Sequence, residues 1–121
     1  MEIILIGTAA SNNIPAFRCV CGVCRQARES RDRKLRRLNS CAFIRGSSGE
    51  RILIDCPAQF MSQLYQCGID DTTIDHMLVS HRHDDHVLGL FYMLTLKKSK
   101  GGVVSSPLKV YSAADTYKSI S

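Results

Sequence analysis

No stretch of this 121-residue sequence approaches the roughly 18 consecutive apolar residues that a membrane-spanning helix requires. The apolar start, EIILIG at residues 2–7, has no basic segment before it and no small-residue cleavage pattern after it. It therefore does not resemble a secretory signal, and we interpret it as a buried first strand of a cytoplasmic protein. With 45% hydrophobic residues, residues 1–121 suit one globular unit built on one core.

Aromatic side chains are also scarce, at 7% of the sequence. The net charge of +5 is concentrated in two basic segments, residues 25–37 and residues 97–100. Such segments are most often solvated helix faces or loops, and the alternative is a surface that attracts an anionic substrate such as a phosphate ester or RNA. Because no aromatic residue is interleaved with the arginines of residues 25–37, a dedicated surface for single-stranded RNA is the less favoured interpretation.

Apolar patterning predicts strands that alternate with helices. The strands are expected at residues 2–7, 41–45, 51–56, 75–80 and 107–112, with the second and third forming a hairpin. Helices are expected at residues 22–30, from Pro57 to Cys67, at residues 86–96 as a mostly buried helix, and from residue 112 onward. The basic segment and its glycines at residues 97–102 form a predicted loop. This alternation is typical of the α/β class.

The sequence SHRHDDH at residues 80–86 holds three of the four histidines of the chain. In an extended segment, residues two apart point the same way, so His81 and His83 can bind one ion together. Asp85 follows at the same spacing and His86 stands where a helix begins, so a bend can direct both toward a second ion. Imidazole and carboxylate groups suit Zn²⁺, and also Mn²⁺ or iron. Paired ions of this kind are typical of hydrolytic sites.

The segment LVSHRHDDHVLGL at residues 78–90 resembles the H-x-H-x-D-H signature of the metallo-β-lactamase fold, with Ser80 where that family usually has threonine. Residues 6–28 and 52–64 are similar to one branch of the family. That branch includes the cyclic-ribose-phosphate phosphodiesterase of phosphonate breakdown and the pyrroloquinoline quinone biosynthesis B protein. A transfer-RNA 3′ processing nuclease shares the histidine signature, but the cysteine-rich part of residues 6–28 favours the first branch.

The resemblance implies that His81 and His83 bind a first metal ion and that Asp85 and His86 bind a second, the two ions being zinc or manganese. Asp85 would also be catalytic, acting on the attacking water. Asp55, which closes a strand, would hydrogen-bond the metal loop and orient its ligands, the alternative being a simple turn or cap carboxylate.

Other polar residues near this turn are expected to have no part in catalysis. Arg82 and Asp84 fill the variable positions of the signature, and we expect both to face solvent. His76 lies outside the signature and is interpreted as an ordinary residue at the start of a strand.

Six cysteines without a secretory signal favour metal binding or burial over disulfides. Cys19, Cys21 and Cys24 form C-x-C-x-x-C, which can hold a tetrahedral Zn²⁺ if a fourth ligand comes from elsewhere; free or oxidised thiols are the alternative. In the resembling branch this cluster binds a structural zinc completed by a distant histidine. The remaining cysteines lie in strand or helix patterns and are expected to be small buried residues: Cys41, Cys56 and Cys67.

Metal ligands are missing from the last part of the sequence. After His86 there is no histidine, cysteine or glutamate, and Asp115 is the only acidic residue. The resembling family forms a longer αββα sandwich whose later half supplies a third ligand for the first metal, a bridging aspartate and a final histidine. We therefore expect residues 1–121 to be the N-terminal half of such a sandwich, inactive alone and associating with itself or with a C-terminal half.

The expected function is a metal-dependent phosphodiesterase that acts on a small phosphate ester, with nucleic acid as the less favoured substrate and no membrane partner. One alternative is a non-catalytic metal-binding fragment that acts by assembling with a partner chain. A weaker alternative is an oxidative biosynthetic protein that resembles the pyrroloquinoline quinone biosynthesis B protein.

Overall fold

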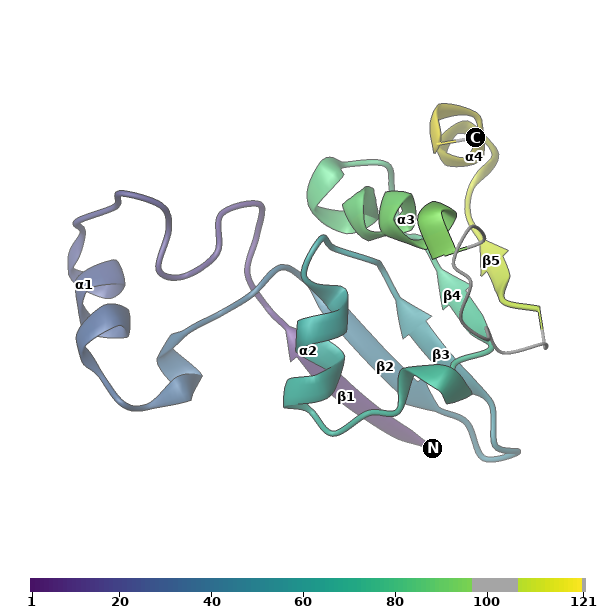
Figure 1. The fold of residues 1–121 in the computed structure, drawn as a ribbon, viewed down its shortest axis with the longest axis horizontal. Coiled ribbons are helices and arrows are strands. Elements are labelled where there is room, and N and C mark those ends of the chain that lie inside the picture. The colour runs from purple at the N-terminus through teal and green to yellow at the C-terminus, as the bar shows by residue number, and fades with distance from the viewer. Residues whose placement is uncertain (97–106, 121) are drawn as a thin grey trace.

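The computed structural model describes residues 1–96 and 107–120, so the predicted loop at residues 97–102 lies outside the described residues. One sheet has the strand order β1-β2-β3-β4-β5 (Figure 1). Its strands are Glu2–Gly7, Cys41–Arg45, Arg51–Ile54, His76–Leu78 and Lys109–Tyr111. β2 pairs antiparallel with both β1 and β3, whereas β4 is parallel to β3 and to β5. The predicted hairpin of β2 and β3 and the α/β class are confirmed.

The helices follow the predicted order with shifts at their starts. They are α1 (Gly22–Glu29), α2 (Phe60–Gln66), α3 (Asp84–Leu96) and α4 (Ala114–Ile120), with short 3-10 helices η1 (Arg33–Leu35) and η2 (Asp71–Thr73). α2 begins later than predicted because the Phe60 N–H donates to the Pro57 carbonyl at 3.1 Å and closes a turn there. Within the described part of the chain, no helix has the length and apolar character needed to cross a membrane.

The core lies on one face of the sheet. Phe43, Leu53 and Met77 are aligned side by side on β2, β3 and β4 and are each at most 1% exposed. Helices α2 and α3 cover this face with Leu64 and Val87, among others. Burial of side chains of this size contributes on the order of 1.5–3 kcal/mol each, so this layer holds the helices against the sheet.

Helix α3 approaches the core closely through Gly89. A methyl group at this position would come within 2.6 Å of the Cys56 sulfur and of the Pro57 carbonyl oxygen. The Gly89 N–H donates to the Cys56 carbonyl at 2.8 Å. Because Gly89 has no side chain, the first turns of α3 can pack directly against the segment that follows β3.

The opposite face of the sheet is apolar but largely uncovered. The same registers align Ile3, Ile44 and Ile52 in one row and Leu5, Ala42, Ile54 and Leu78 in the next. Ile3 and Leu5 are 56% and 70% exposed. The prediction of a buried first strand is therefore wrong for alternate residues of β1, because helices cover only one face of the sheet.

Two further burial predictions are wrong. Cys67 is exposed because α2 ends at Gln66 and Cys67 lies in the turn that follows. Helix α3 is not mostly buried, since Leu88, Phe91 and Tyr92 all have exposed side chains while Val87 packs into the core. An apolar helix sequence does not reveal which of its sides receives a neighbour.

We expect the isolated chain to self-associate through the open face, because apolar patches of this kind on monomers usually bind a partner. Leu5→Lys should reduce the association by placing a charge in the middle of β1. Tyr65→Lys is the matched control, because Tyr65 is 67% exposed but lies on α2. Size-exclusion chromatography with light scattering measures the effect, and equal responses of the two variants would contradict this assignment of the surface.

Candidate metal centre

The candidate metal centre lies where two parallel strands end. Asp55 directly follows β3, and residues 79–83 form the segment between β4 and α3. Because β3 and β4 are parallel, their carboxyl ends meet at one edge of the sheet. The Asp55 N–H donates to the Leu78 carbonyl at 2.7 Å, which joins the residue that follows β3 to the last residue of β4. The fold thus brings Asp55 to the histidine-rich turn.

Asp55 is the centre of a buried hydrogen-bond network and is 4% exposed. Its Oδ1 accepts from the Ser80 backbone N–H at 2.7 Å, and its Oδ2 accepts from the Ser80 hydroxyl at 2.7 Å. Oδ2 also lies 2.8 Å from His86 Nδ1. A buried carboxylate is stable only when such donors replace water. The hydrogen bonds predicted between Asp55 and the turn are therefore present.

These contacts orient two histidine rings. His86 Nδ1 faces the carboxylate of Asp55, which leaves Nε2 directed away from it. The Ser80 hydroxyl donates its hydrogen to Asp55, so it accepts a hydrogen bond from His81 Nδ1, which lies 2.9 Å away. The Nε2 atom of His81 takes no part in this contact. Asp55 and Ser80 thereby leave one nitrogen on each ring for a ligand. The sequence predicted that Asp55 contacts this turn, but it did not indicate the bridging position of the Ser80 hydroxyl.

The three rings of the turn gather in one place. The ring centroids of His81 and His86 are 4.0 Å apart, and those of His81 and His83 are 4.7 Å apart. Asp85 Oδ2 lies 3.3 Å from His86 Nε2. Three imidazoles and a carboxylate are a donor set that zinc or manganese accepts, so the chemistry of these residues fits the metals that the sequence predicts. No three of their ligand atoms, however, lie within 4.8 Å of one another.

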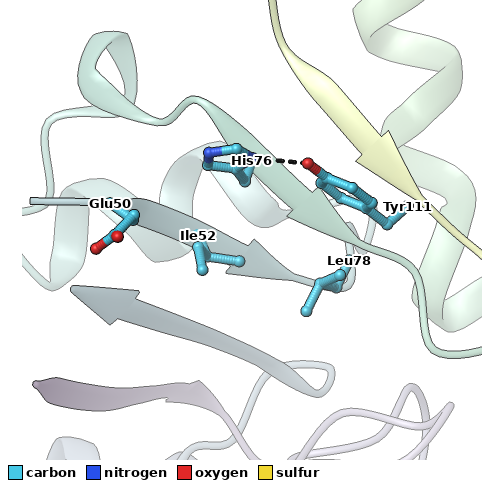
Figure 2. Close-up of a pocket in the computed structure, with 5 residues that line it drawn as sticks. All are labelled: Glu50, Ile52, His76, Leu78 and Tyr111. Atoms are coloured by element: carbon cyan, nitrogen blue, oxygen red, sulfur yellow. Dashed lines mark hydrogen bonds between the residues drawn. The ribbon is translucent and has the colours of Figure 1, made fainter. Parts of the chain in front are cut away.

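Neighbouring polar residues lie apart from this centre. Arg82 and Asp84 are exposed, as predicted. His76 begins β4, and its Nδ1 lies 3.3 Å from the Tyr111 hydroxyl (Figure 2). These two residues lie beside an open hollow of about 310 Å³. Figure 2 shows them with the other residues that line it: Glu50, Ile52 and Leu78. This hollow belongs to the open apolar face, not to the histidine turn.

The cysteines form a second candidate site. The sulfur atoms of Cys19, Cys21 and Cys24 all lie within 4.8 Å of one another, and within residues 1–96 and 107–120 they are the only such group of three potential ligands. Cys21 caps α1, and its sulfur accepts from the Cys24 N–H at 3.5 Å. This N–H and, second, the Cys19 thiol lower the pKa of Cys21 to about 7. The thiolate, which is the metal-binding form, is therefore favoured near neutral pH.

Arginine side chains hold the backbone around the cysteines. Arg28 donates to the Cys19 carbonyl and, at 2.8 Å, to the Ala16 carbonyl. Arg36 donates to the Ala27 carbonyl at 3.1 Å. These contacts were not predicted from the sequence, in which both arginines belong to a basic run that is typical of a solvated surface.

The chain resembles known proteins over most of its length. The family model described as Anti-Pycsar protein Apyc1 matches residues 31–119. An octanoyltransferase from Porphyromonas gingivalis is 40% identical over 96 residues, which are 79% of this chain and 18% of that protein. A ribonuclease Z from Bradyrhizobium diazoefficiens is 41% identical over 64 residues, which are 50% of this chain and 21% of that protein. The chain thus spans only a small part of these curated relatives.

Solved structures agree with this chain over nearly all of it. A diphosphatase from the PhnP family has a TM-score of 0.76 and 27% identity, covering 96% of this chain and 42% of its own. Zn²⁺-bound PqqB from Methylobacterium extorquens has a TM-score of 0.75 and 23% identity, with coverages of 99% and 40%. The metallo-β-lactamase fold protein YhfI from Bacillus subtilis has a TM-score of 0.58 and 19% identity, with coverages of 96% and 38%.

Metal binding to the cysteines should protect them from alkylation. Without metal at pH 7.5, iodoacetamide should modify Cys21 well before Cys41, because burial raises the pKa of Cys41 to about 12. Zn²⁺ should slow the modification of Cys19, Cys21 and Cys24. The exposed Cys67 is the internal control and should react at the same rate with or without Zn²⁺. Peptide mass spectrometry measures each rate, and a lack of protection at all three cluster thiols would contradict a site there.

Asp55→Asn should free the ring of His86. Asp55 has a φ of 65°, which asparagine tolerates, so the substitution removes the negative charge and replaces one of the two acceptor oxygens by an NH2 group without adding backbone strain. We expect a loss of about 1–3 kcal/mol in the free energy of unfolding, because buried donors lose their partner. Asp84→Asn, in the exposed part of the same turn, should change little. Chemical denaturation and ¹⁵N NMR of the His86 tautomer measure the two effects, and an unchanged tautomer would contradict the orienting role.

Proposed function

This chain belongs to the Anti-Pycsar protein Apyc1 family and has the metallo-β-lactamase fold, and we propose that it carries part of the dinuclear metal centre of a phosphodiesterase. The observation that carries this proposal is the buried Asp55 carboxylate, which accepts hydrogen bonds from Ser80 and contacts His86. Such contacts are typical of groups that orient metal ligands. Relatives that are a diphosphatase and a ribonuclease Z support the broader class of metal-dependent hydrolase.

In this proposal, His81 and His83 hold a first divalent ion, and Asp85 and His86 hold a second. Zinc or manganese ions bound there would supply an activated water and neutralise charge on the phosphate ester. Asp85 accepts a proton from the attacking water at its carboxylate, which lies 3.3 Å from His86 Nε2. Ser80 and Asp55 keep the rings of His81 and His86 in place during this step.

The cysteine cluster has a structural role in this proposal. Cys19, Cys21 and Cys24 hold one zinc ion, with a fourth ligand from outside this group, and the zinc stabilises the segment between β1 and β2. The convergence of the three sulfur atoms supports this assignment. A Zn²⁺-bound PqqB among the similar structures is compatible with it.

The proposed substrate of the histidine turn is a small phosphate ester in the cytoplasm. Further ligands for both ions would come from a C-terminal half, or less effectively from a second copy of this chain. The open apolar face of the sheet supports such a partner, because its exposed side chains include Ile3, Leu5 and Leu78. The 42% coverage of the PhnP-family diphosphatase is compatible with ligands outside the aligned part.

A second candidate function is that of a biosynthetic protein related to coenzyme PQQ synthesis protein B. The relative of that name from Methylobacterium radiotolerans is 27% identical over 107 residues, which supports this candidate. A chain that binds metal but completes no active site with any partner would favour the non-catalytic alternative. Hydrolysis of phosphate esters would distinguish a phosphodiesterase from the biosynthetic protein and from the non-catalytic fragment.

The test is hydrolysis of bis-p-nitrophenyl phosphate with Zn²⁺ or Mn²⁺. We expect this chain alone to show little turnover, because catalysis needs each ligand held within about 0.5 Å of its productive position. Adding a C-terminal half of the same family should restore turnover. His83→Ala should then abolish it while circular dichroism stays unchanged, and Arg82→Ala, an exposed neighbour, should retain it. Full activity of His83→Ala, or no activity in any assembly, would contradict the proposal.

A further inference from the structure

The net positive charge of this protein comes from one part of the chain. Residues 16–38, here called the basic lobe, contain α1, η1 and the cysteine cluster. The lobe has eight basic and two acidic residues, a net charge of +6. The whole chain has 16 basic and 11 acidic residues, so the rest has eight and nine, a net charge of −1. The basic character of the protein is therefore a property of the lobe alone.

Nothing described in the structure neutralises this charge. All eight basic side chains are exposed, and none forms an ion pair within residues 1–96 and 107–120. Arg25, Arg28 and Arg36 donate to backbone carbonyls, which fixes their position but leaves their charge uncompensated. Among the described residues, Arg33 and Arg37 make no side-chain hydrogen bond or ion pair, which leaves their guanidinium groups available to a partner.

The lobe emerges from the same edge of the sheet as the histidine turn. β1 and β3 both pair antiparallel with β2, so β1 runs parallel to β3 and β4. The lobe leaves the carboxyl end of β1 and returns at the start of β2, which places it at the edge where β3 and β4 also end. Figure 1 shows α1 set apart from the sheet, on the side of the molecule opposite β5 and α4. The lobe thus lies at the edge of the sheet that carries the histidine turn.

Exposed apolar side chains accompany the charge. Phe17 is 93% exposed and adjoins Arg18, and Val20 and Val23 are 66% and 60% exposed. Seven of the eight basic residues are arginines, whose planar guanidinium groups can donate two parallel hydrogen bonds to the oxygens of one phosphate. An unpacked aromatic ring beside such cations is the combination with which proteins bind single strands, because a base can stack on the ring. An acidic peptide would use the arginines but would leave the ring of Phe17 without a role.

We propose that the basic lobe binds the phosphodiester backbone of a single-stranded nucleic acid, with Phe17 stacking on a base. This binding goes beyond the proposed hydrolysis and does not depend on it, because it is measured without turnover. The recognised chemistry is the phosphodiester, which RNA and DNA share.

The test is fluorescence anisotropy of the full chain with Zn²⁺, using labelled 20-nucleotide RNA and DNA of mixed sequence at several salt concentrations. The double variant Arg33→Gln with Arg37→Gln removes two positive charges from the lobe. Because each neutralised phosphate of a single strand contributes about 0.7 to the slope of log affinity against log salt, the slope of this variant should be shallower by about 1.4. Arg33→Lys with Arg37→Lys should keep the slope. Lys109→Gln with Lys118→Gln removes the same charge from exposed positions outside the lobe and should leave the slope unchanged.

Phe17→Ala separates stacking from charge. It should weaken binding by about fivefold or more while leaving the salt slope intact, because a stacked base contributes binding energy without releasing counterions. Circular dichroism and zinc content should be unchanged in every variant. Equal loss of binding in the lobe pair and the Lys109/Lys118 pair would overturn the proposal, since any positive surface would then suffice. Polyglutamate that competes as well as RNA would overturn it in favour of an acidic protein partner.

Discussion

The buried carboxylate of Asp55 is the constraint on which the histidine turn at residues 80–86 depends. It holds the Ser80 backbone and hydroxyl and the ring of His86, so residues from the ends of two strands act as one unit. A charge that is 4% exposed is tolerated only because every donor around it is in place. Shifting β4 by one residue would separate these donors from Asp55, so strand register and ligand orientation are set together.

The packing of α3 supports the same unit from its other side. His86 lies in the first turn of this helix, and Gly89, one turn later, contacts the segment that leaves β3. The backbone also joins them, because the Cys56 N–H donates to the His86 carbonyl at 2.8 Å. The helix start is therefore fixed by hydrogen bonds and by close packing at once. This rigidity suits the metal centre that we propose for the histidine turn.

Much of this structure could be predicted from the sequence, wherever a local pattern determines it. The hairpin, the order of strands and helices, and the proximity of Cys19, Cys21 and Cys24 all follow from residues that are close in sequence. The bridging hydroxyl of Ser80 could not be predicted, because it depends on Asp55, 25 residues away. The prediction of which side chains are buried failed for the same reason, because burial depends on residues that are far apart in the sequence. Residues 3–6 of β1 are all apolar, so the sequence does not show which face of the strand receives the helices.

The basic lobe is attached to the sheet in a way that makes it independent of the histidine turn. The segment that contains the lobe leaves the sheet after Gly7 and rejoins it at Cys41, and these two residues are paired on neighbouring strands. In topological terms the lobe is the long loop of a hairpin. The entropy of closing such a loop grows only slowly with its length, so residues can be added or removed there without disturbing the register of β1 and β2. The sheet can therefore keep the geometry of the histidine turn while the lobe beside it changes in length or in charge.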